Sequence, residues 1–201
     1  DPERLGVDLT IKEATTSLAD INKLAPKGSI PSSIALPPGL QLTGKIAGQL
    51  NNLILDAKLN TAWGTAAFDG QLAGFVTGKN QTYKGTLNLN EFDAGKWLKQ
   101  EGTVGKITGR ATVDGKGIDV NTLSTKFGLD VQSAYLNGYT YQNLDATGTL
   151  SNGIVDIVGA LKDPNANVKL DANLGLKGDF PSVTGETVIN ELNLPALKLY
   201  N

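Results

Sequence analysis

The chain has 201 residues, a formal net charge of −2, 24 glycines, and neither cysteine nor histidine. The near-neutral charge excludes a basic field that would attract nucleic acid. The missing residue types exclude thiolate zinc sites, disulfide frameworks and the commonest general acid–base group. Hydrophobic residues make up 40% of the chain, which is too much for a disordered protein, and they form no run of about 18 residues that would span a membrane.

The first predicted elements are a strand and a helix. Apolar residues alternate with other residues from Leu5 to Ile11, which is the pattern of a half-buried strand. Helical spacing follows over residues 15–24. The opening Asp1-Pro-Glu-Arg is interpreted as a cut inside a larger protein, so an export signal or membrane anchor is expected outside this sequence.

Four alternating runs between residues 40 and 89 predict antiparallel strands in series. Asn51-Asn52, Asp69-Gly70 and Lys79-Asn80 supply turn residues between or beside them. Asp93 is predicted to cap a short helix over residues 94–99, because its carboxylate can accept free N–H groups of the first turn. Trp97 in that helix is expected to pack against the end of the sheet.

The alternation restarts near Ile107 and continues to Leu176. A long strand is predicted over residues 123–135, and Asn137-Gly138 is a favourable sequence for a type I′ hairpin turn. A register change of one residue is predicted near Asn143. These patterns predict hairpins that follow one another.

One phrase, an alternating strand that runs into a short apolar segment, recurs three times, with copies that begin at Val7, Thr86 and Glu186. Recurrence at long spacing is typical of a chain built from stacked units. We therefore predict the end of a preceding repeat unit in residues 1–28, a first β repeat unit in residues 29–100 and a second in residues 101–201.

The predicted fold is all-β: a long antiparallel curled sheet, a β-taco with an open groove, with short helices at the repeat ends. Such a sheet has one apolar face, which must be covered. A two-sheet sandwich would fill that space with protein, whereas a curled sheet would leave it partly open. Few large aromatic residues and inner glycines such as Gly44 and Gly48 favour the curled sheet.

We predict that the alternating apolar residues line the groove and hold lipid there. Each of them alone fits an ordinary core equally well, so the prediction concerns the face as a whole. The predicted lining consists of Leu42, Ile46, Leu50, Leu55, Leu59, Phe68, Leu72, Leu87, Leu89, Ile107, Leu129, Val131, Leu144, Leu150, Val155, Ile157, Val168, Leu170 and Leu174.

The repeated strand closures, the Gly/Asn-rich hairpins and two phrases, Gly138-Tyr-Thr-Tyr-Gln-Asn-Leu144 and Leu161-Lys-Asp-Pro-Asn165, resemble TamB proteins of the AsmA-like superfamily. The versions in Bacteroidota-type Gram-negative bacteria are the most similar. The resemblance covers essentially the whole chain and includes no catalytic signature.

The resemblance implies an inner-membrane-anchored protein that crosses the periplasm as a β-taco. Such proteins contact a Bam-type outer-membrane barrel protein through a C-terminal domain, which is expected outside this sequence. The family is linked to outer-membrane protein assembly and to movement of phospholipid between the two membranes. This chain is interpreted as an internal periplasmic section.

The expected function is a conduit for phospholipid acyl chains, which needs no cofactor or metal. The main alternative is a scaffold or chaperone that receives outer-membrane strands at a sheet edge by β-augmentation. A third alternative is a passive adhesin or stalk with a filled interior. The exposed edges also predict an edge-to-edge dimer of the isolated chain.

No enzyme is expected, because acidic residues such as Asp114, Asp119 and Asp163 lie in turn-rich segments, where carboxylates usually form turns. The spacing from Asp114 to Asp119 matches no EF-hand, so a calcium site is not expected there. Tyr135, Tyr139 and Tyr141 are consistent with a sugar-binding platform or with cross-strand packing, and packing is favoured.

Overall fold

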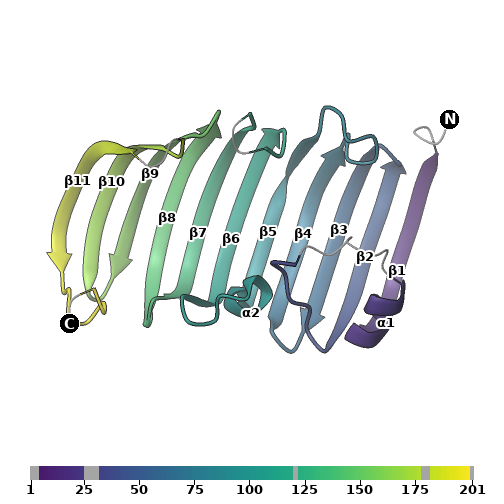
Figure 1. Ribbon diagram of the computed structural model, residues 1–201, viewed down its shortest axis with the longest axis horizontal. Coiled ribbons are helices and arrows are strands. Elements are labelled where there is room, and N and C mark those ends of the chain that lie inside the picture. Colours follow the sequence, from purple (N-terminus) through teal and green to yellow (C-terminus); the bar gives the residue numbers. More distant parts are fainter. Residues whose placement is uncertain (1–4, 25–31, 120–121, 178–181, 200–201) are drawn as a thin grey trace.

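The computed structural model describes residues 5–24, 32–119, 122–177 and 182–199, in which eleven strands form one sheet. The strand order follows the chain order from β1 to β11, and each strand is antiparallel to its neighbours (Figure 1). The sheet is open, with β1 and β11 as its edges, which confirms the predicted all-β curled sheet. The elements are β1 (Gly6–Ser17), α1 (Leu18–Leu24), β2 (Gly39–Gln49), β3 (Asn52–Thr61), β4 (Gly64–Ala73), β5 (Thr82–Asp93), α2 (Ala94–Leu98), β6 (Val104–Lys116), β7 (Ser124–Leu136), β8 (Tyr139–Ser151), β9 (Ile154–Asp163), β10 (Ala166–Gly175) and β11 (Ser182–Leu192).

Tight turns return the chain beside the strand that it has just left. Asn137 and Gly138, between β7 and β8, have φ values of 47° and 88°, as the predicted type I′ turn requires. Asn152 and Gly153 repeat this geometry between β8 and β9, with φ values of 51° and 74°. Asn and Gly adopt left-handed backbone with less strain than other residues. Local turn chemistry therefore gives the sheet its simple order.

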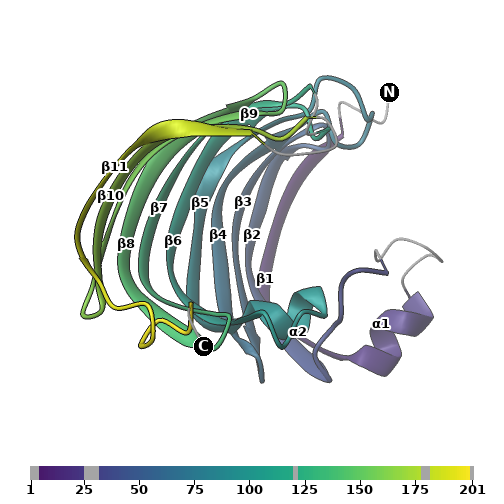
Figure 2. The same ribbon diagram turned by 60° about the vertical axis from the view of Figure 1, so that its left-hand side comes forward.

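The sheet is curled, and its apolar face is the concave one. In Figure 2 the strands bend around a hollow, and α1 and α2 lie on the hollow side. Trp97 of α2 stacks on Phe92 at the end of β5, with ring centroids 5.4 Å apart, so Phe92 points to that side. Because successive strand residues alternate between faces, the apolar positions in register with Phe92 face the hollow and the polar ones face outward.

Two glycines in the sheet make room for an aromatic ring. Asp69-Gly70, which was predicted to be a turn, lies inside β4, where Gly70 pairs with Leu55 and Gly85. A Cβ atom on Gly70 or on Gly85 would lie 2.7 Å from Cζ of Phe68, so the ring of Phe68 lies over both glycines. A ring over strand glycines replaces the packing that their missing side chains cannot supply.

Three closing segments lie at one long margin of the concave face, which we call the closure margin (Figures 1 and 2). They are α1, α2 and the turn at residues 193–198, which follow β1, β5 and β11. In an antiparallel meander these odd-numbered strands run in the same direction, so their ends meet one margin. The closing phrase of the sequence therefore builds one side of the molecule.

The caps of the last two closing segments are alike. Asp93 accepts the Lys96 N–H at 3.1 Å, which confirms the predicted cap of α2. Asn193 Oδ1 accepts the Ala196 N–H at 3.2 Å in the same way. The third closing segment forms a turn, in which the Leu197 N–H donates to the Asn193 carbonyl at 3.0 Å.

The predicted division into repeat units stays a prediction. Its boundary at residues 28 and 29 lies outside the described residues. The boundary at residues 100 and 101 falls between α2 and β6, but β5 and β6 pair along their length, so the sheet continues across it.

Candidate functional site: the concave apolar face

Residues paired across neighbouring strands form four rows that cross the concave face from β2 to β11. We call them the groove rows, and they pass through Phe127, Leu129, Val131 and Leu150 of β7 and β8. None of the four contains a charged residue along the described registers. The row through Leu129 consists, from β2 to β10, of Gly44, Ala57, Phe68, Leu87, Ala111, Leu129, Ala146, Gly159 and Leu170.

Every predicted lining residue except Ile107 and Leu50 belongs to a groove row. Ile107 pairs with Phe92 and Ala134, so it faces the same side one step nearer the closure margin. Leu50 lies in the turn between β2 and β3, where its N–H donates to the Leu5 carbonyl at 2.9 Å. The structure thus brings the predicted set together on one face, and its binding of lipid stays a prediction.

The predicted lining omits seven large side chains of the groove rows. They share the alternation of their strands, since Phe127, for example, lies two residues before Leu129. The pattern that found the others could therefore have found them. The omitted residues are Leu53, Tyr83, Val113, Phe127, Leu161, Val183 and Ile189.

The concave face is covered by no second sheet within the described residues. Leu129 and Ala111 are half-buried, and Leu170 is 39% exposed. The buried apolar residues of the described chain are mostly alanines, with Leu197 as the large exception. The structure is therefore not the sandwich that the sequence left open, and the face remains an open trough.

Aromatic packing fixes α2 at the closure margin. Trp97 stacks on Phe92 and makes an edge contact with Trp63, in which the ring centroids are 6.2 Å apart. The segment that precedes β2 passes beside this cluster, since the Ala35 N–H donates to the Trp97 carbonyl at 2.8 Å. Pro37 in the same segment is fully buried. In the middle of the sheet, α2 and the segment before β2 therefore cover the closure margin.

The turn at residues 193–198 covers the concave face near β11. Leu197 is 1% exposed and lines a cavity of about 240 Å³ with Leu199 and with residues of β8 to β11. Ile157, Leu161 and Val168 are among the lining side chains. This end of the trough therefore has a partly covered apolar pocket.

A buried carboxylate joins β8 to the turn between β9 and β10. Asp163 is 6% exposed, and its oxygens accept the Gln142 N–H at 2.9 Å, the Asn165 N–H at 2.8 Å and the Tyr139 hydroxyl. Gln142 precedes Asn143, which has a φ of 52° and is left out of the pairing with β7. The β7–β8 register is the same before and after Asn143, so the predicted register change is not seen in this pairing. The two phrases that carry the family resemblance therefore contact each other through Asp163.

Tyr139 has a perturbed pKa because of this network. The Asn165 amide donates to the phenol oxygen at 3.0 Å and lowers the pKa of Tyr139. The hydrogen bond to Asp163, desolvation and the charge of Asp163 act in the opposite direction, and the net pKa lies above its ordinary value. The phenol therefore stays protonated at neutral pH and donates to Asp163.

Of the three tyrosines considered as a possible platform, only two are in contact with each other. Tyr139 and Tyr141 make an edge contact with ring centroids 4.9 Å apart. Tyr135 pairs with Thr140, so it lies on the opposite face of the sheet. A platform of three rings is therefore not formed, and the contact of Tyr139 with Tyr141 is packing within one strand.

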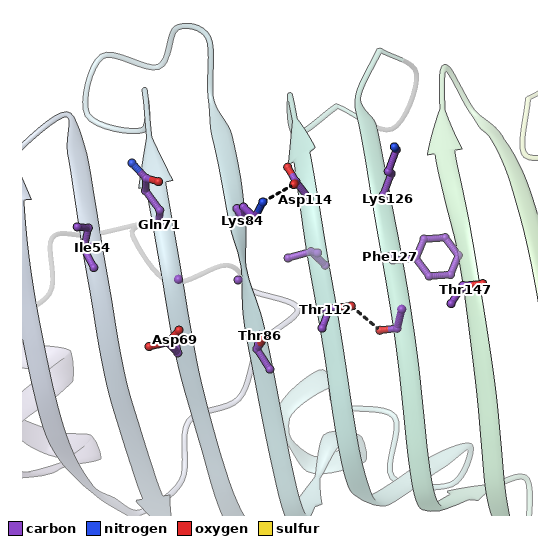
Figure 3. Close-up of a pocket in the computed structure, with 14 residues that line it drawn as sticks. Ile54, Asp69, Gln71, Lys84, Thr86, Thr112, Asp114, Lys126, Phe127 and Thr147 are labelled. Atoms are coloured by element: carbon purple, nitrogen blue, oxygen red, sulfur yellow. Dashed lines mark hydrogen bonds and ion pairs between the residues drawn. The ribbon is translucent and has the colours of Figure 1, made fainter.

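The convex face carries a shallow depression of about 640 Å³ over β3 to β8 (Figure 3). Lys84 Nζ lies 3.0 Å from Asp114 Oδ2, and both side chains are mostly exposed. Lys126 and Asp69 balance each other in the same lining. An exposed ion pair of this kind contributes about 0–1 kcal/mol. The mixed charges give no net field for an anion or a cation, so we interpret this surface as a solvated face.

Asp114 points to this face beside Lys84, and it does not join a cation site. Among the described residues, no three His, Cys, Asp or Glu side chains gather where they could hold a metal ion. No helix in the described part of the chain has the length and apolar character needed to cross a membrane.

Comparison with known proteins adds no relative to this description. No protein-family model matches the chain, and no curated protein or solved structure is significantly similar to it.

Proposed function

We propose that the concave apolar face binds the acyl chains of phospholipids and lets them move along the sheet, across the strands. The proposal places the chain in the periplasm, within an inner-membrane-anchored TamB-like protein that carries lipid between the two membranes. Docking to a Bam-type outer-membrane barrel protein belongs to regions outside this sequence. The observation that carries the proposal is the set of uncharged groove rows, which continue across the sheet and remain half-exposed.

The energetics of moving a lipid favour such a surface. Each methylene exposed to water costs about 0.8 kcal/mol, so a two-chain lipid faces a barrier on the order of tens of kcal/mol. Strands about 4.8 Å apart make a trough of about 48 Å across the sheet. An apolar surface of this length replaces water along the path and needs no catalytic group, cofactor or metal.

The side-chain sizes along the trough favour movement of an acyl chain over binding at one fixed position. Along the row through Leu129, large side chains are interspersed with alanine and glycine. An acyl chain therefore meets many similar, weak sites. Headgroups can stay in water at the margin opposite the closure margin.

A charged residue in the trough is expected to remove bound lipid. In Leu129→Glu the carboxylate lies between Ala111 and Ala146, and an acyl chain laid over it would have to desolvate the charge. We expect phospholipid that copurifies with the protein to fall at least about tenfold, since desolvation of an ion costs several kcal/mol. Native mass spectrometry with lipid extraction measures this loss.

The matched control is Ile54→Glu, which places the same charge on the convex face at a side chain that is 59% exposed. It should keep the lipid. Leu170→Glu, at the partly exposed end of the same row, is a second groove variant in case Leu129→Glu does not fold. A folded wild-type protein without any lipid, or equal lipid in groove and control variants, would count against the proposal.

The scaffold alternative is favoured by one observation, which is that every residue of the edge strand β11 is exposed. It predicts affinity for unfolded β-strand peptides through main-chain hydrogen bonds. Peptide binding should then survive in Leu129→Glu, whereas lipid binding should not. The adhesin alternative requires a filled interior, which an open trough does not offer.

A further inference from the structure

The end of β5 contains a β-bulge, and side chains of β6 contact it. Asn90 and Glu91 form the bulge, because Leu89 pairs with Gly109 and Phe92 pairs with Ile107. Thr108, which lies opposite the bulge, accepts the Glu91 N–H through its hydroxyl at 3.0 Å. The Glu91 carboxylate also lies 3.0 Å from Lys106 Nζ. A bulge leaves ladder groups unpaired, and here β6 satisfies them with side chains.

The end of β1 contains a bulge that pairs with β2 in the register seen between β5 and β6. Ile11 pairs with Gly44 and Ala14 pairs with Leu42, so Lys12 and Glu13 form the bulge and Thr43 lies opposite it. Gln41 Nε2 donates to the Glu13 carboxylate at 2.9 Å. Gln41 occupies the position before Leu42 that Lys106 occupies before Ile107.

The two partner strands therefore share a pattern. Lys106-Ile-Thr-Gly-Arg110 of β6 and Gln41-Leu-Thr-Gly-Lys45 of β2 meet the bulges of Leu89-Asn-Glu-Phe92 and Ile11-Lys-Glu-Ala14. In each case the first partner residue contacts the bulge glutamate, and the threonine lies opposite the bulge.

Strand β11 ends in the same bulge sequence, Ile189-Asn-Glu-Leu192. Its pairing with β10 skips Asn190, and the Asn193 cap that follows corresponds to Asp93. No described strand pairs with the outer side of β11. The backbone of Glu191 pairs with Asn167 of β10, but within the described residues its carboxylate makes no hydrogen bond or ion pair. Ile189 is 53% exposed, whereas its counterpart Leu89 is half-buried under paired neighbours.

We infer that the outer edge of β11 binds, in antiparallel register, an extended strand with the pattern Lys/Gln–Ile/Leu–Thr–Gly–Arg/Lys. The glycine lies opposite Ile189, the Ile or Leu lies opposite Leu192, and the threonine hydroxyl meets the bulge. The basic or amide side chain at the first position binds the Glu191 carboxylate. The partner is thus a β-strand of defined sequence chemistry, and the inference holds whether or not the concave face carries lipid.

Disulfide trapping tests the register, because the chain has no cysteine of its own. Thr187 corresponds to Leu87, which pairs with Ala111, and Val183 corresponds to Tyr83, which pairs with Gly115. The probe is a synthetic peptide with the sequence of residues 104–116. We expect Thr187→Cys protein to form a disulfide with a peptide that has cysteine at 111 at least about tenfold faster than with cysteine at 112, which faces the other side.

A second cysteine pair and a control cysteine on the other edge of the sheet complete the test. Val183→Cys protein should prefer cysteine at peptide position 115, which provides the same register if Thr187→Cys protein does not fold. Leu9→Cys, on the other edge of the sheet, should trap the peptide at least about tenfold more slowly. Equal rates at positions 111 and 112, equal trapping at Leu9, or faster trapping of a second copy of the protein would each overturn the inference.

Two substitutions test the recognition itself. Thr108→Val in the peptide removes the hydroxyl acceptor and should weaken binding by about two- to tenfold, as one hydrogen bond does. Glu191→Lys in the protein should weaken binding of the original peptide and restore it for a Lys106→Glu peptide. Fluorescence anisotropy of a labelled peptide measures both, and equal affinity for all these pairs would contradict the proposed contacts.

Discussion

Gly44→Ala should destabilise the protein by about 3 kcal/mol, in the upper range for single substitutions. Gly44 has a φ of 154°, and a Cβ atom there would overlap the Asp56 carbonyl oxygen and lie 2.8 Å from the Ala57 Cα. Both obstacles are backbone atoms of β3, so no side chain can rotate to relieve the contact. β2 and β3 would have to move apart at Gly44 to make room for the new Cβ atom. Urea denaturation followed by circular dichroism measures the loss.

The control for this substitution is Gly6→Ala, where a new Cβ meets nothing within 4 Å. Its free energy of unfolding should stay within about 0.5 kcal/mol of the wild type, as for most exposed positions. Equal unfolding midpoints for the two variants would mean that the close approach of β2 and β3 does not hold in solution.

Asp163→Ala is expected to cost about 3 kcal/mol as well. The substitution leaves the Tyr139 hydroxyl and the N–H groups of Gln142 and Asn165 without their acceptor. A buried donor that loses its partner costs about 1–3 kcal/mol, and part of this is recovered where water enters. Because the network joins β8 to the β9–β10 turn, we also expect faster hydrogen exchange at Gln142 and Asn165.

Asp156→Ala is the matched control for Asp163→Ala. Asp156 is exposed and accepts Asn173 Nδ2 at 2.6 Å, so water can replace its contact. Its loss should cost less than about 1 kcal/mol. If both aspartate variants unfold at the same urea concentration, the Asp163 network does not stabilise the fold.

Much of the fold could be predicted because alternation is a local signal. Polar and apolar residues in alternation define a strand and its inner face together, and this placed Leu129 and Leu144 correctly on one side. The cap at Asp93 and the turn at Asn137 were also predictable, since each depends on residues next to each other in the sequence.

The errors concern features that depend on neighbouring strands. Asp69-Gly70 has the composition of a turn, but Gly70 is needed where the ring of Phe68 lies across the sheet. Tyr135 falls on the convex face because the pairing of β7 with β6 shifts by one residue between Gly109 and Thr108, and this shift depends on the neighbouring strand. The composition of the turn at Asp163 likewise does not reveal that its carboxylate accepts an N–H group from β8.

The common direction of β1, β5 and β11 restricts how such a protein can change in length during evolution. The closing segments follow β1, β5 and β11, so the interval from one closing strand to the next is four strands and then six, both even. Loss or gain of a single strand would reverse every later strand and move the later closing segments to the opposite margin. Viable length variants should therefore differ by whole hairpins, and relatives of this chain should contain closing segments at even strand intervals.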